Sequence, residues 1–414
     1  DFTGATDLGA LLTRSGLRSV VCVGVPPEGL ELPPCEAVIV ALKSRSTSVR
    51  RAVGDSLSAL MWLRRRECAR FYFKYCSTFD STAEGNIGPV ADALLDALGE
   101  DFTVVCPAHP ENGRTVYRGY LFVGDELLSE SPMRHHPLTP MRDSNLLRLL
   151  GQQTPHRVGL AGYAQVSGGV SLLRHSLKNL RAEGYRYAVV DALEQQHLLT
   201  IAAACQDLSL TTGAAGLAMG LAYEARERGQ VSVHAQAPFP RGPGPTAVLA
   251  GSCSPATLAQ IATMQRFYPS RALDPELLVR DPQATVEDLA RWAGEQAAAG
   301  PVLVCASAPP RLVRRYTSVF GPEIAARIEE ALARLACRLV AAGFNRLVVA
   351  GGETSGAVVQ ALGIQALIVC PEIVPGVPWT RALPHSDLAL ALKSGNFGAP
   401  DFFLKALEML IHRY

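Results

Sequence analysis

Short apolar runs alternate along the whole chain with segments of helical composition, and this alternation limits the fold more than any other feature. The apolar runs predict strands at 19–25, 36–43, 70–74, 101–106, 186–192, 246–251, 301–307, 345–351 and 365–370. Strands that alternate with helices are typical of βαβ units, which form a parallel sheet covered by helices on both faces. We therefore predict an α/β fold of mostly parallel sheets flanked by helices.

The segments between these strands predict helices. Helical composition is found at 53–66, 173–183, 193–206, 254–266, 286–299 and 322–343.

One segment marks a domain boundary. Residues 234–245, HAQAPFPRGPGP, are too rich in Pro and Gly to form a helix or a central strand. Because 414 residues suffice for two full cores, we predict a first domain at 1–233, a linker at 234–245 and a second domain at 246–414.

Composition excludes several classes of protein. With 48% hydrophobic and 19% charged residues, the chain is too apolar to be disordered. A formal net charge of +1 lacks the positive surplus of proteins that bind nucleic acid or a membrane surface. No stretch approaches the ~20 consecutive apolar residues of a membrane-spanning helix. We therefore expect small-molecule partners, with no nucleic acid and no membrane, while a homo-oligomer is compatible with this composition.

The cysteines and histidines indicate neither disulfides nor a zinc site. The ten cysteines are scattered singly, mostly in or beside apolar runs, and no CxxC pair occurs. This usage is typical of buried thiols in a cytoplasmic protein. The nine histidines show no ligand spacing, and His135 and His136 are adjacent in a Pro-flanked segment. The sequence alone therefore identifies no metal ligands.

Residues 71–89, FYFKYCSTFDSTAEGNIGP, predict a strand, a polar loop and a helix in direct succession. Phe71 and Phe73 alternate with Tyr72 and Lys74 as in a strand, and IGPVADALLDAL has an amphipathic helical pattern. The loop gathers hydrogen-bonding side chains at one strand end: Ser77, Thr78, Asp80, Ser81, Thr82 and Asn86. The alternative to a ligand site is that this loop is an ordinary connection rich in turn residues. In a ligand site, Asp80 is the one carboxylate among neutral groups and hence the candidate catalytic base.

Other polar residues of the first half also follow predicted strands. Lys43 and Arg45 are interleaved with serines at the end of 36–43, and Arg114 lies in a loop after 101–106. Cations beside hydroxyls suit a small, anionic, hydroxylated ligand, because Arg binds carboxylates in a bidentate manner. The alternative interpretation is that these three cations are ordinary solvated charges of surface loops. A further loop, before the helix of LGALLTRSG, is predicted to present Thr3, Gly4, Thr6 and Asp7.

Three glycine-rich turns in the second half lie between a predicted strand and a helix or helix start, at 251–254, 351–355 and 394–398. Glycine lets the backbone approach a ligand closely, and a helix N-terminus presents free N–H groups with partial positive charge. For any one such turn, the alternative is that its glycine only allows the chain to turn from the strand into the helix. Because parallel strands end at the same edge of a sheet, three turns together favour a nucleotide crevice. Neither GxxxxGK[ST] nor GxGxxG after a strand is present, so the nucleotide would be held in another manner.

Segments spread over nearly the whole chain resemble one known family. In order they are DFTGATD, KSRS, FKYCSTFDSTAEGNIGP, NGRTVYRGYLFVGD, GSCS, AGGETSG, PGVPW and LALKSGNFG. Together they resemble the four-carbon acid sugar kinases, most closely the branch that acts on 3-oxo-tetronate. The family has an N-terminal sugar-acid-binding domain and a C-terminal nucleotide-binding domain. The resemblance implies an ATP-dependent kinase for the terminal 4-hydroxyl of an acid sugar, with its active site in the cleft between the domains.

The resemblance also implies which residues bind each ligand. The acid sugar would be held by the DFTG, KSRS and STFDST segments. Phosphoryl transfer needs alignment of the attacking hydroxyl and neutralisation of charge, usually with Mg²⁺. Asp80 would orient or deprotonate that hydroxyl, ahead of Asp7, and Glu353 would hold Mg²⁺ through water. The residues expected to contact ATP are Ser254, Gly351, Gly352, Glu353, Thr354 and Gly395.

Two other functions stay open at this point. The chain could phosphorylate D-threonate or D-erythronate, or it could bind a nucleotide and a sugar acid without turnover. Family members reach the DFTGATD segment from an apolar first strand and a further acidic residue. Neither is in this sequence, so we expect a segment to precede Asp1 and to complete the site there.

Overall fold

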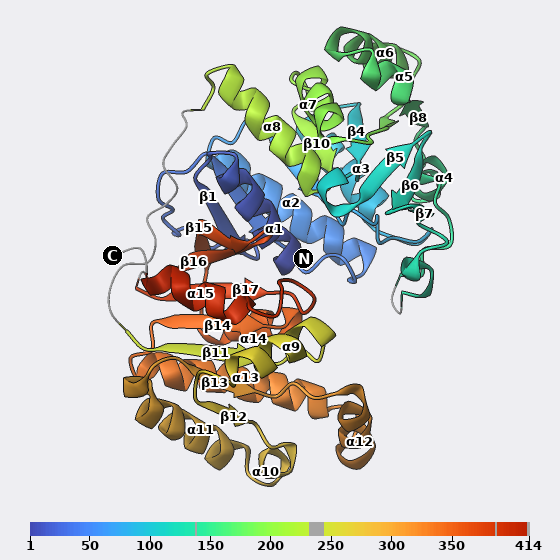
Figure 1. Cartoon of the computed structure of the whole chain (residues 1–414). Helices are drawn as coiled ribbons and strands as arrows, with labels where there is room; N and C mark the ends of the chain where they lie inside the picture. The colour runs from blue at the N-terminus through green and yellow to red at the C-terminus, as the bar shows by residue number, and fades with distance from the viewer. Residues whose placement is uncertain (137–138, 232–243, 386, 412–414) are drawn as a thin grey trace. The chain divides into compact units, whose positions relative to one another are not determined.

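The structure is a computed structural model that describes residues 1–136, 139–231, 244–385 and 387–411 (Figure 1). Its internal contacts divide the chain into two compact units. The first unit comprises Asp1, Thr3–Leu17 and Gly24–His234, and the second comprises Phe2, Arg18–Val23 and Ala235–Tyr414. Apart from its last two residues, the predicted linker at 234–245 lies outside the described residues.

The first unit is built on a five-stranded sheet with the strand order β3-β10-β4-β9-β8. All neighbouring strands in this sheet are parallel. Its strands are β3 (Phe71–Lys74), β4 (Thr103–Cys106), β8 (Val158–Ala161), β9 (Tyr187–Val190) and β10 (Leu210–Gly213). Every residue of β4, β9 and β10 is buried, as expected where helices cover both faces of a parallel sheet. The strands predicted at 70–74, 101–106 and 186–192 are confirmed.

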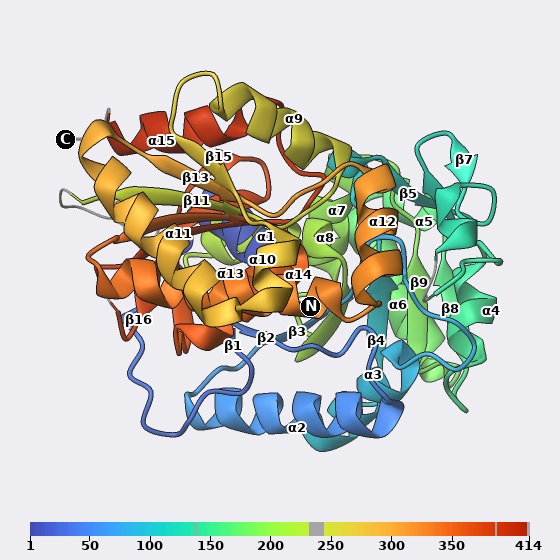
Figure 2. The same cartoon turned by 90° about the horizontal axis from the view of Figure 1, so that it is seen from below.

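Eight α-helices belong to the described part of the first unit. They are α1 (Phe2–Arg14), α2 (Val49–Arg65), α3 (Ile87–Leu98), α4 (Leu146–Gly151), α5 (Tyr163–Ser167), α6 (Val170–Ala182), α7 (Gln195–Ala204) and α8 (Ala215–Glu227). Of these, α3, α4, α6 and α8 contact strands of this sheet. In α3, the residues Val90, Ala91, Leu94 and Leu95 are buried at helical spacing, and Gly99 ends the helix in the left-handed region. Figure 2 shows α2 as a long straight helix with α3 beside it.

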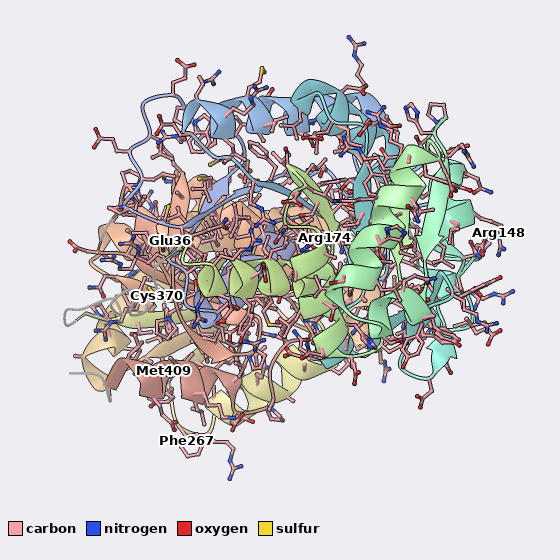
Figure 3. All side chains as sticks on the ribbon, turned by 90° about the horizontal axis from the view of Figure 1, so that it is seen from above. Glu36, Arg148, Arg174, Phe267, Cys370 and Met409 are labelled. Atoms are coloured by element: carbon pink, nitrogen blue, oxygen red, sulfur yellow. The ribbon has the colours of Figure 1, made fainter. Side chains whose placement is uncertain are left out.

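A small antiparallel sheet follows β4 in the chain. It consists of β5 (Arg114–Tyr117), β6 (Tyr120–Val123) and β7 (Glu126–Leu127). Arg148 of α4, labelled in Figure 3, donates two hydrogen bonds to the Asp143 carboxylate, at 2.8 and 2.7 Å. This exposed pair holds the segment that leads into α4. Strand β2 (Ala37–Ala41) precedes α2 and confirms the strand predicted at 36–43.

The second unit has one large sheet, with its strands in the order β12-β13-β11-β14-β17-β16-β15-β1. Neighbours are parallel from β12 to β17 and antiparallel from β17 to β1. The strands are β1 (Ser19–Val23), β11 (Thr246–Ala250), β12 (Ser270–Ala272), β13 (Val302–Cys305), β14 (Arg346–Ala350), β15 (Ala366–Val374), β16 (Val377–Leu383) and β17 (Ala389–Lys393). The strands predicted at 246–251, 301–307, 345–351 and 365–370 are confirmed.

Figure 2 shows α9 and α15 on one face of this sheet and α11 and α13 on the other. The helices of the unit are α9 (Pro255–Met264), α10 (Pro275–Arg280), α11 (Pro282–Gln296), α12 (Pro310–Phe320), α13 (Ile324–Ala341), α14 (Gly352–Ala361) and α15 (Phe402–Ile411). Buried Ile261 of α9 and Phe402 of α15 share one core cluster with Trp379 of β16. This packing brings the start of α9 close to the segment that precedes α15.

Residues 18–23 are grouped with the second unit, although the predicted division places them in the first. They form β1, which pairs antiparallel with β15 through Val20 opposite Ile368 and Val21 opposite Leu367. Val20 and Val21 are at most 1% exposed. Strand β1 therefore joins the sheet of the second unit, and its valines are buried there.

Two further properties concern the described residues. Across 1–136, 139–231, 244–385 and 387–411, none of the helices is both long and apolar enough to cross a membrane. Burial raises the pKa of the Cys106 and Cys205 thiols to about 12. These two cysteines therefore stay protonated at neutral pH.

We expect Val21→Ala to destabilise the second unit although Val21 lies near the start of the chain. Loss of two buried methyl groups should lower the free energy of unfolding by about 1–3 kcal/mol. Hydrogen exchange should show faster exchange in β15, with β10 of the first unit little changed. Val25→Ala is the matched control because Val25 is 37% exposed. Faster exchange in β10 alone would contradict the assignment of β1 to the second unit.

Candidate active-site residues of the two units

The first turns of α1 correct one sequence prediction. The loop expected to present Thr3, Gly4, Thr6 and Asp7 is instead helix, because α1 begins at Phe2. The reason is a helix cap: the Asp1 carboxylate accepts a hydrogen bond from the Gly4 N–H at 2.6 Å. A Cβ atom at Gly4 would lie 2.8 Å from Lys74 Nζ. Glycine at this position thus permits close approach of the lysine to the helix.

The loop after β3 holds Asp80 in a constrained conformation. Phe79, the residue before it, has a φ of 50°, which is unusual for a bulky side chain and costs about 1–3 kcal/mol. Its ring is fully buried and makes an edge-to-face contact with Tyr75, with ring centroids 5.4 Å apart. Thr78 Oγ1 donates to Asp80 Oδ1 at 2.5 Å. Packing of Phe79 therefore sets the direction of the neighbouring Asp80 carboxylate.

Arg45 links this loop to the start of α1. Its guanidinium lies 3.1 Å from Asp1 Oδ2 and 3.4 Å from Asp80 Oδ2. The Asp80 side chain is 4% exposed, whereas that of Arg45 is 40% exposed. The structure thus brings together Arg45 and Asp80, which the sequence places 35 positions apart, with one face of the cation open to solvent.

Lys74, at the end of β3, belongs to the same group of charges. Burial lowers the pKa of Lys74, the Asp7 and Asp80 carboxylates oppose this shift, and Arg45 adds to it. Its Nζ donates to the Tyr75 carbonyl oxygen at 3.4 Å. Sequence analysis noted Lys74 as a strand residue and gave it no role. The structure adds this ammonium to the acidic and basic side chains around Asp80.

Three other predicted residues hold the loops in place. Asn86 Nδ2 donates to the carbonyl oxygens of Ser44 at 2.6 Å and Thr47 at 3.4 Å, so it fastens the KSRS segment. Ser81 and Thr82 are fastened by Gln153, a residue that sequence analysis missed. Its Nε2 donates to Ser81 Oγ at 2.8 Å and to the Thr82 carbonyl at 2.6 Å. Gln153 lies far along the chain, and no local pattern distinguishes it from other glutamines.

Lys43, Ser77 and Arg114 are the other predicted residues of the first unit. Lys43 is exposed and Ser77 is half-buried. Arg114, on β5, donates to the Asn112 carbonyl and lies near His109. Burial lowers the pKa of His109 to about 4; Glu111 opposes this shift, and Lys74, Arg114 and Arg14 add to it. The His109 imidazole is therefore neutral at pH 7.

In the second unit, the three glycine-rich turns follow neighbouring parallel strands, β11, β14 and β17. The last residues of these strands, Ala250, Ala350 and Lys393, lie in register across the sheet. The turns also touch one another, because a Cβ atom at Gly251 would lie 2.2 Å from Thr354 Oγ1. The prediction that the three turns meet at one sheet edge is confirmed.

Ser254 connects the first turn to the third. It is the N-cap of α9, where its Oγ accepts from the Thr257 N–H at 3.2 Å and donates to the Gly395 carbonyl at 2.6 Å. A Cβ atom at Gly395 would lie 2.5 Å from Ser252 Oγ, so only glycine fits there without displacement. Gln260, which sequence analysis missed, supports the third turn by donating from Nε2 to the Phe397 carbonyl at 2.9 Å.

The second turn forms the N-terminus of α14. Gly351 is its N-cap with a φ of 136°, a conformation that favours glycine. Gly352 and Glu353 are exposed, whereas Thr354 is buried. A Cβ atom at Gly352 would meet no other atom within 4 Å. The free N–H groups of this helix end are therefore accessible and suited to an anion.

Comparison with protein families assigns both halves of the chain. Residues 1–221 match the model of a sugar-binding N-terminal domain, and residues 247–403 match the model of a nucleotide-binding C-terminal domain. The polar loops around Asp80 lie in the first match, and the three glycine-rich turns lie in the second.

Relatives of known name cover nearly the whole chain. The chain is 50% identical to a 3-oxo-tetronate kinase of Pseudomonas fluorescens, over 99% of this chain and 95% of the relative. It is 49% identical to a 3-oxo-tetronate kinase of Burkholderia multivorans, over 99% and 96%. A crystal structure of a Haemophilus influenzae protein, 44% identical, superimposes with a TM-score of 0.88 over 99% and 98%. The chain therefore belongs to the four-carbon acid sugar kinase family.

Proposed function

We propose that this chain is an ATP-dependent kinase that phosphorylates the 4-hydroxyl of 3-oxo-tetronate. The observation that carries the proposal is identity near 49% with 3-oxo-tetronate kinases over both domains and nearly the full length. Identity spread over both the sugar-binding and the nucleotide-binding domain supports the complete reaction rather than nucleotide binding alone.

ATP binds, in this proposal, at the edge of the second sheet where β11, β14 and β17 end. The N-termini of α9 and α14 supply N–H donors and partial positive charge for the phosphates. Exposure at Gly352 leaves room for a phosphate beside the first turn of α14. The contacting residues are Ser254, Gly351, Gly352, Glu353, Thr354 and Gly395.

The acid sugar binds around Asp80 in the first unit. Arg45 is half-exposed beside Asp80 and can pair with the substrate carboxylate, and Lys43 lies in the same segment. Ser81, Thr82 and Asn86 position the loops through the hydrogen bonds described above. The full set comprises Thr3, Gly4, Asp7, Lys43, Arg45, Ser77, Thr78, Ser81, Thr82, Asn86 and Arg114.

Asp80 accepts the proton of the 4-hydroxyl as the reaction proceeds. The hydroxyl oxygen forms a bond to the γ-phosphorus, the bond from that phosphorus to the bridging oxygen breaks, and ADP leaves. Asp80 is nearly buried and held by Thr78 and Arg45, so its carboxylate is oriented before the substrate arrives. Because the γ-phosphorus must reach the hydroxyl, the proposal places the active site in the cleft between the two domains.

Mg²⁺ fits the nucleotide site as a partner of the ATP phosphates. Among the residues that the structure describes, no group of three His, Cys, Asp or Glu side chains could hold a metal ion. Mg²⁺ usually keeps several waters and binds through substrate phosphates with one or two carboxylates. Glu353, exposed in the first turn of α14, would hold it through water. The ion would neutralise charge on the transferred phosphoryl group.

The test of this function is a direct assay of the product. Purified protein, ATP and 3-oxo-tetronate should yield ADP and an acid whose mass has increased by one phosphoryl group. D-threonate and D-erythronate are assayed in parallel. Faster turnover of either one would replace the proposed substrate, and binding of ATP and acid with no product would identify a non-catalytic binding protein.

We expect variants of the glycine-rich turns to weaken ATP binding alone. Ser254→Ala removes one of the two side-chain hydrogen bonds from α9 to the Gly395 carbonyl, and Gly352→Val adds bulk where a Cβ atom meets nothing within 4 Å. Each should raise the dissociation constant for ATP on the order of tenfold or more. Calorimetry should show nearly unchanged binding of the acid. Gly356→Val, one turn further along α14 and also in open space, is the control. Equal loss of both ligands in a folded variant argues against two separate sites.

Lys43→Ala and Arg45→Ala test recognition of the substrate carboxylate. Loss of a charge-assisted hydrogen bond of about 1.5–3 kcal/mol should lower kcat/KM for the acid by roughly ten- to a hundredfold. The KM for ATP should hardly change. Arg51→Ala is the control, because Arg51 is an exposed residue of α2 that pairs only weakly with Asp55, at 3.6 Å. Wild-type kinetics in both single variants would show that neither Lys43 nor Arg45 binds the substrate carboxylate.

Asp80→Asn should lower kcat by roughly 10²–10⁴ with little change in KM, because a base acts mainly in the transition state. Asp92→Asn is the matched control. Asp92 is a half-buried carboxylate of α3 that accepts from Thr154 at 2.8 Å and Tyr187 at 2.5 Å. The control should lose stability and keep its turnover number. Asp80→Asn with a lowered melting temperature and intact kcat would show a structural role, and Asp7 would become the next candidate base.

A further inference from the structure

Lys393 is a buried lysine at the edge of the sheet where the three glycine-rich turns meet. It is the last residue of β17 and is 0% exposed. Its Nζ donates to Thr257 Oγ1 at 3.0 Å and to the Gly395 carbonyl at 2.8 Å. The ring of Phe402 lies on a third side, with its centroid 5.9 Å from Nζ. Sequence analysis gave this residue no role.

Among the residues that the structure describes, no acidic side chain forms an ion pair with this ammonium. Burial alone lowers the pKa of Lys393 to about 8. The groups that face it are uncharged: Thr257 from α9, Gly395 from the turn and Phe402 from α15. Asp401, the residue before α15, pairs with Lys405 at 3.1 Å. A buried, unpaired cation is costly to a fold, so a hydrophobic residue would serve better if only packing were required.

The hydrogen bonds of Lys393 converge on one backbone atom. The Gly395 carbonyl accepts from Lys393 Nζ at 2.8 Å, from Ser254 Oγ at 2.6 Å and from Thr257 Oγ1 at 3.0 Å. Ser254 and Thr257 both belong to the start of α9. Three donors therefore fix the Gly395 turn against the helix end that is suited to a phosphate.

We propose that Lys393 is a positioning residue for the nucleotide phosphates: it fixes the Gly395 turn against α9 and places a buried positive charge behind it. This inference rests on the proposed ATP site of the second unit. It concerns the phosphates and not the base, because the charge and the fixed turn lie where helix N-termini converge. The substrate class that it selects is a nucleoside di- or triphosphate over the free nucleoside.

Calorimetry with ADP and with adenosine separates this role from a structural one. Lys393→Met removes the charge and both hydrogen bonds while keeping an unbranched side chain. It should weaken ADP binding on the order of ten- to a hundredfold and leave adenosine binding within about twofold. Lys405→Met, at an exposed lysine of α15, is the control and should bind both ligands as the wild type does. Unchanged ADP binding, or an equal loss of both ligands in a folded variant, overturns the proposal.

The wild-type protein supplies a second test that does not depend on folding of the variant. The ammonium loses its charge as the pH rises through about 8. ADP affinity should therefore fall between pH 7 and pH 9.5 while adenosine affinity stays level. Two level profiles overturn the proposal. Failure of the kinase assay with normal ADP binding would reject the proposed reaction and leave the assignment of Lys393 standing.

Discussion

Parallel pairing of β11, β14 and β17 is the constraint on which the second unit depends. Their last residues lie in register, so the three turns that follow are forced to the same sheet edge. Close packing there leaves no space for a side chain at Gly251 or Gly395. Ser254, Thr257 and Lys393 then fasten the turns through one carbonyl group. This geometry supports the proposed anion site of backbone N–H groups, which uses none of the common phosphate-binding motifs.

In the first unit, the main structural feature is a carboxylate, that of Asp80, which is oriented beside cations. Phe79 adopts a strained backbone conformation that its buried ring maintains, and Asp80 follows directly. Arg45 then joins Asp80 to the cap of α1, and Lys74 lies among the same charges. Packing of Phe79 and the ionic contacts of Arg45 hold the Asp80 carboxylate in one orientation, which supports the proposed site for a small acid.

Sequence patterns predicted those parts of the molecule that depend on local chemistry. Strands such as β11 and β14 are continuous apolar runs because both of their faces are buried, and Pro255 after Ser254 marks the start of α9. Strand β10, with the sequence LTTG, escaped prediction because it is short and half polar, and its burial comes from its neighbours. The start of α1 was predicted as a loop because Thr and Gly disfavour helices, whereas the Asp1 cap and packing override that preference.

Residues that act across long separations could not be found in this way. Gln153 and Lys393 look like ordinary polar residues in the sequence, and their roles depend on contacts with segments 71 and 136 positions away. Pairing of β1 with β15 has the same origin, since it joins residues near 20 to residues near 368. Propensity and periodicity describe neighbours in the chain, whereas these contacts are set by the tertiary fold.

Hydrogen exchange with each ligand added alone tests the central claim that the two units bind different substrates. A non-hydrolysable ATP analogue should slow exchange of backbone N–H groups in 251–258, 351–356 and 394–398, and 3-oxo-tetronate should slow exchange in 74–86. Protection of 74–86 by the nucleotide alone, with the three glycine-rich turns unaffected, would contradict the account.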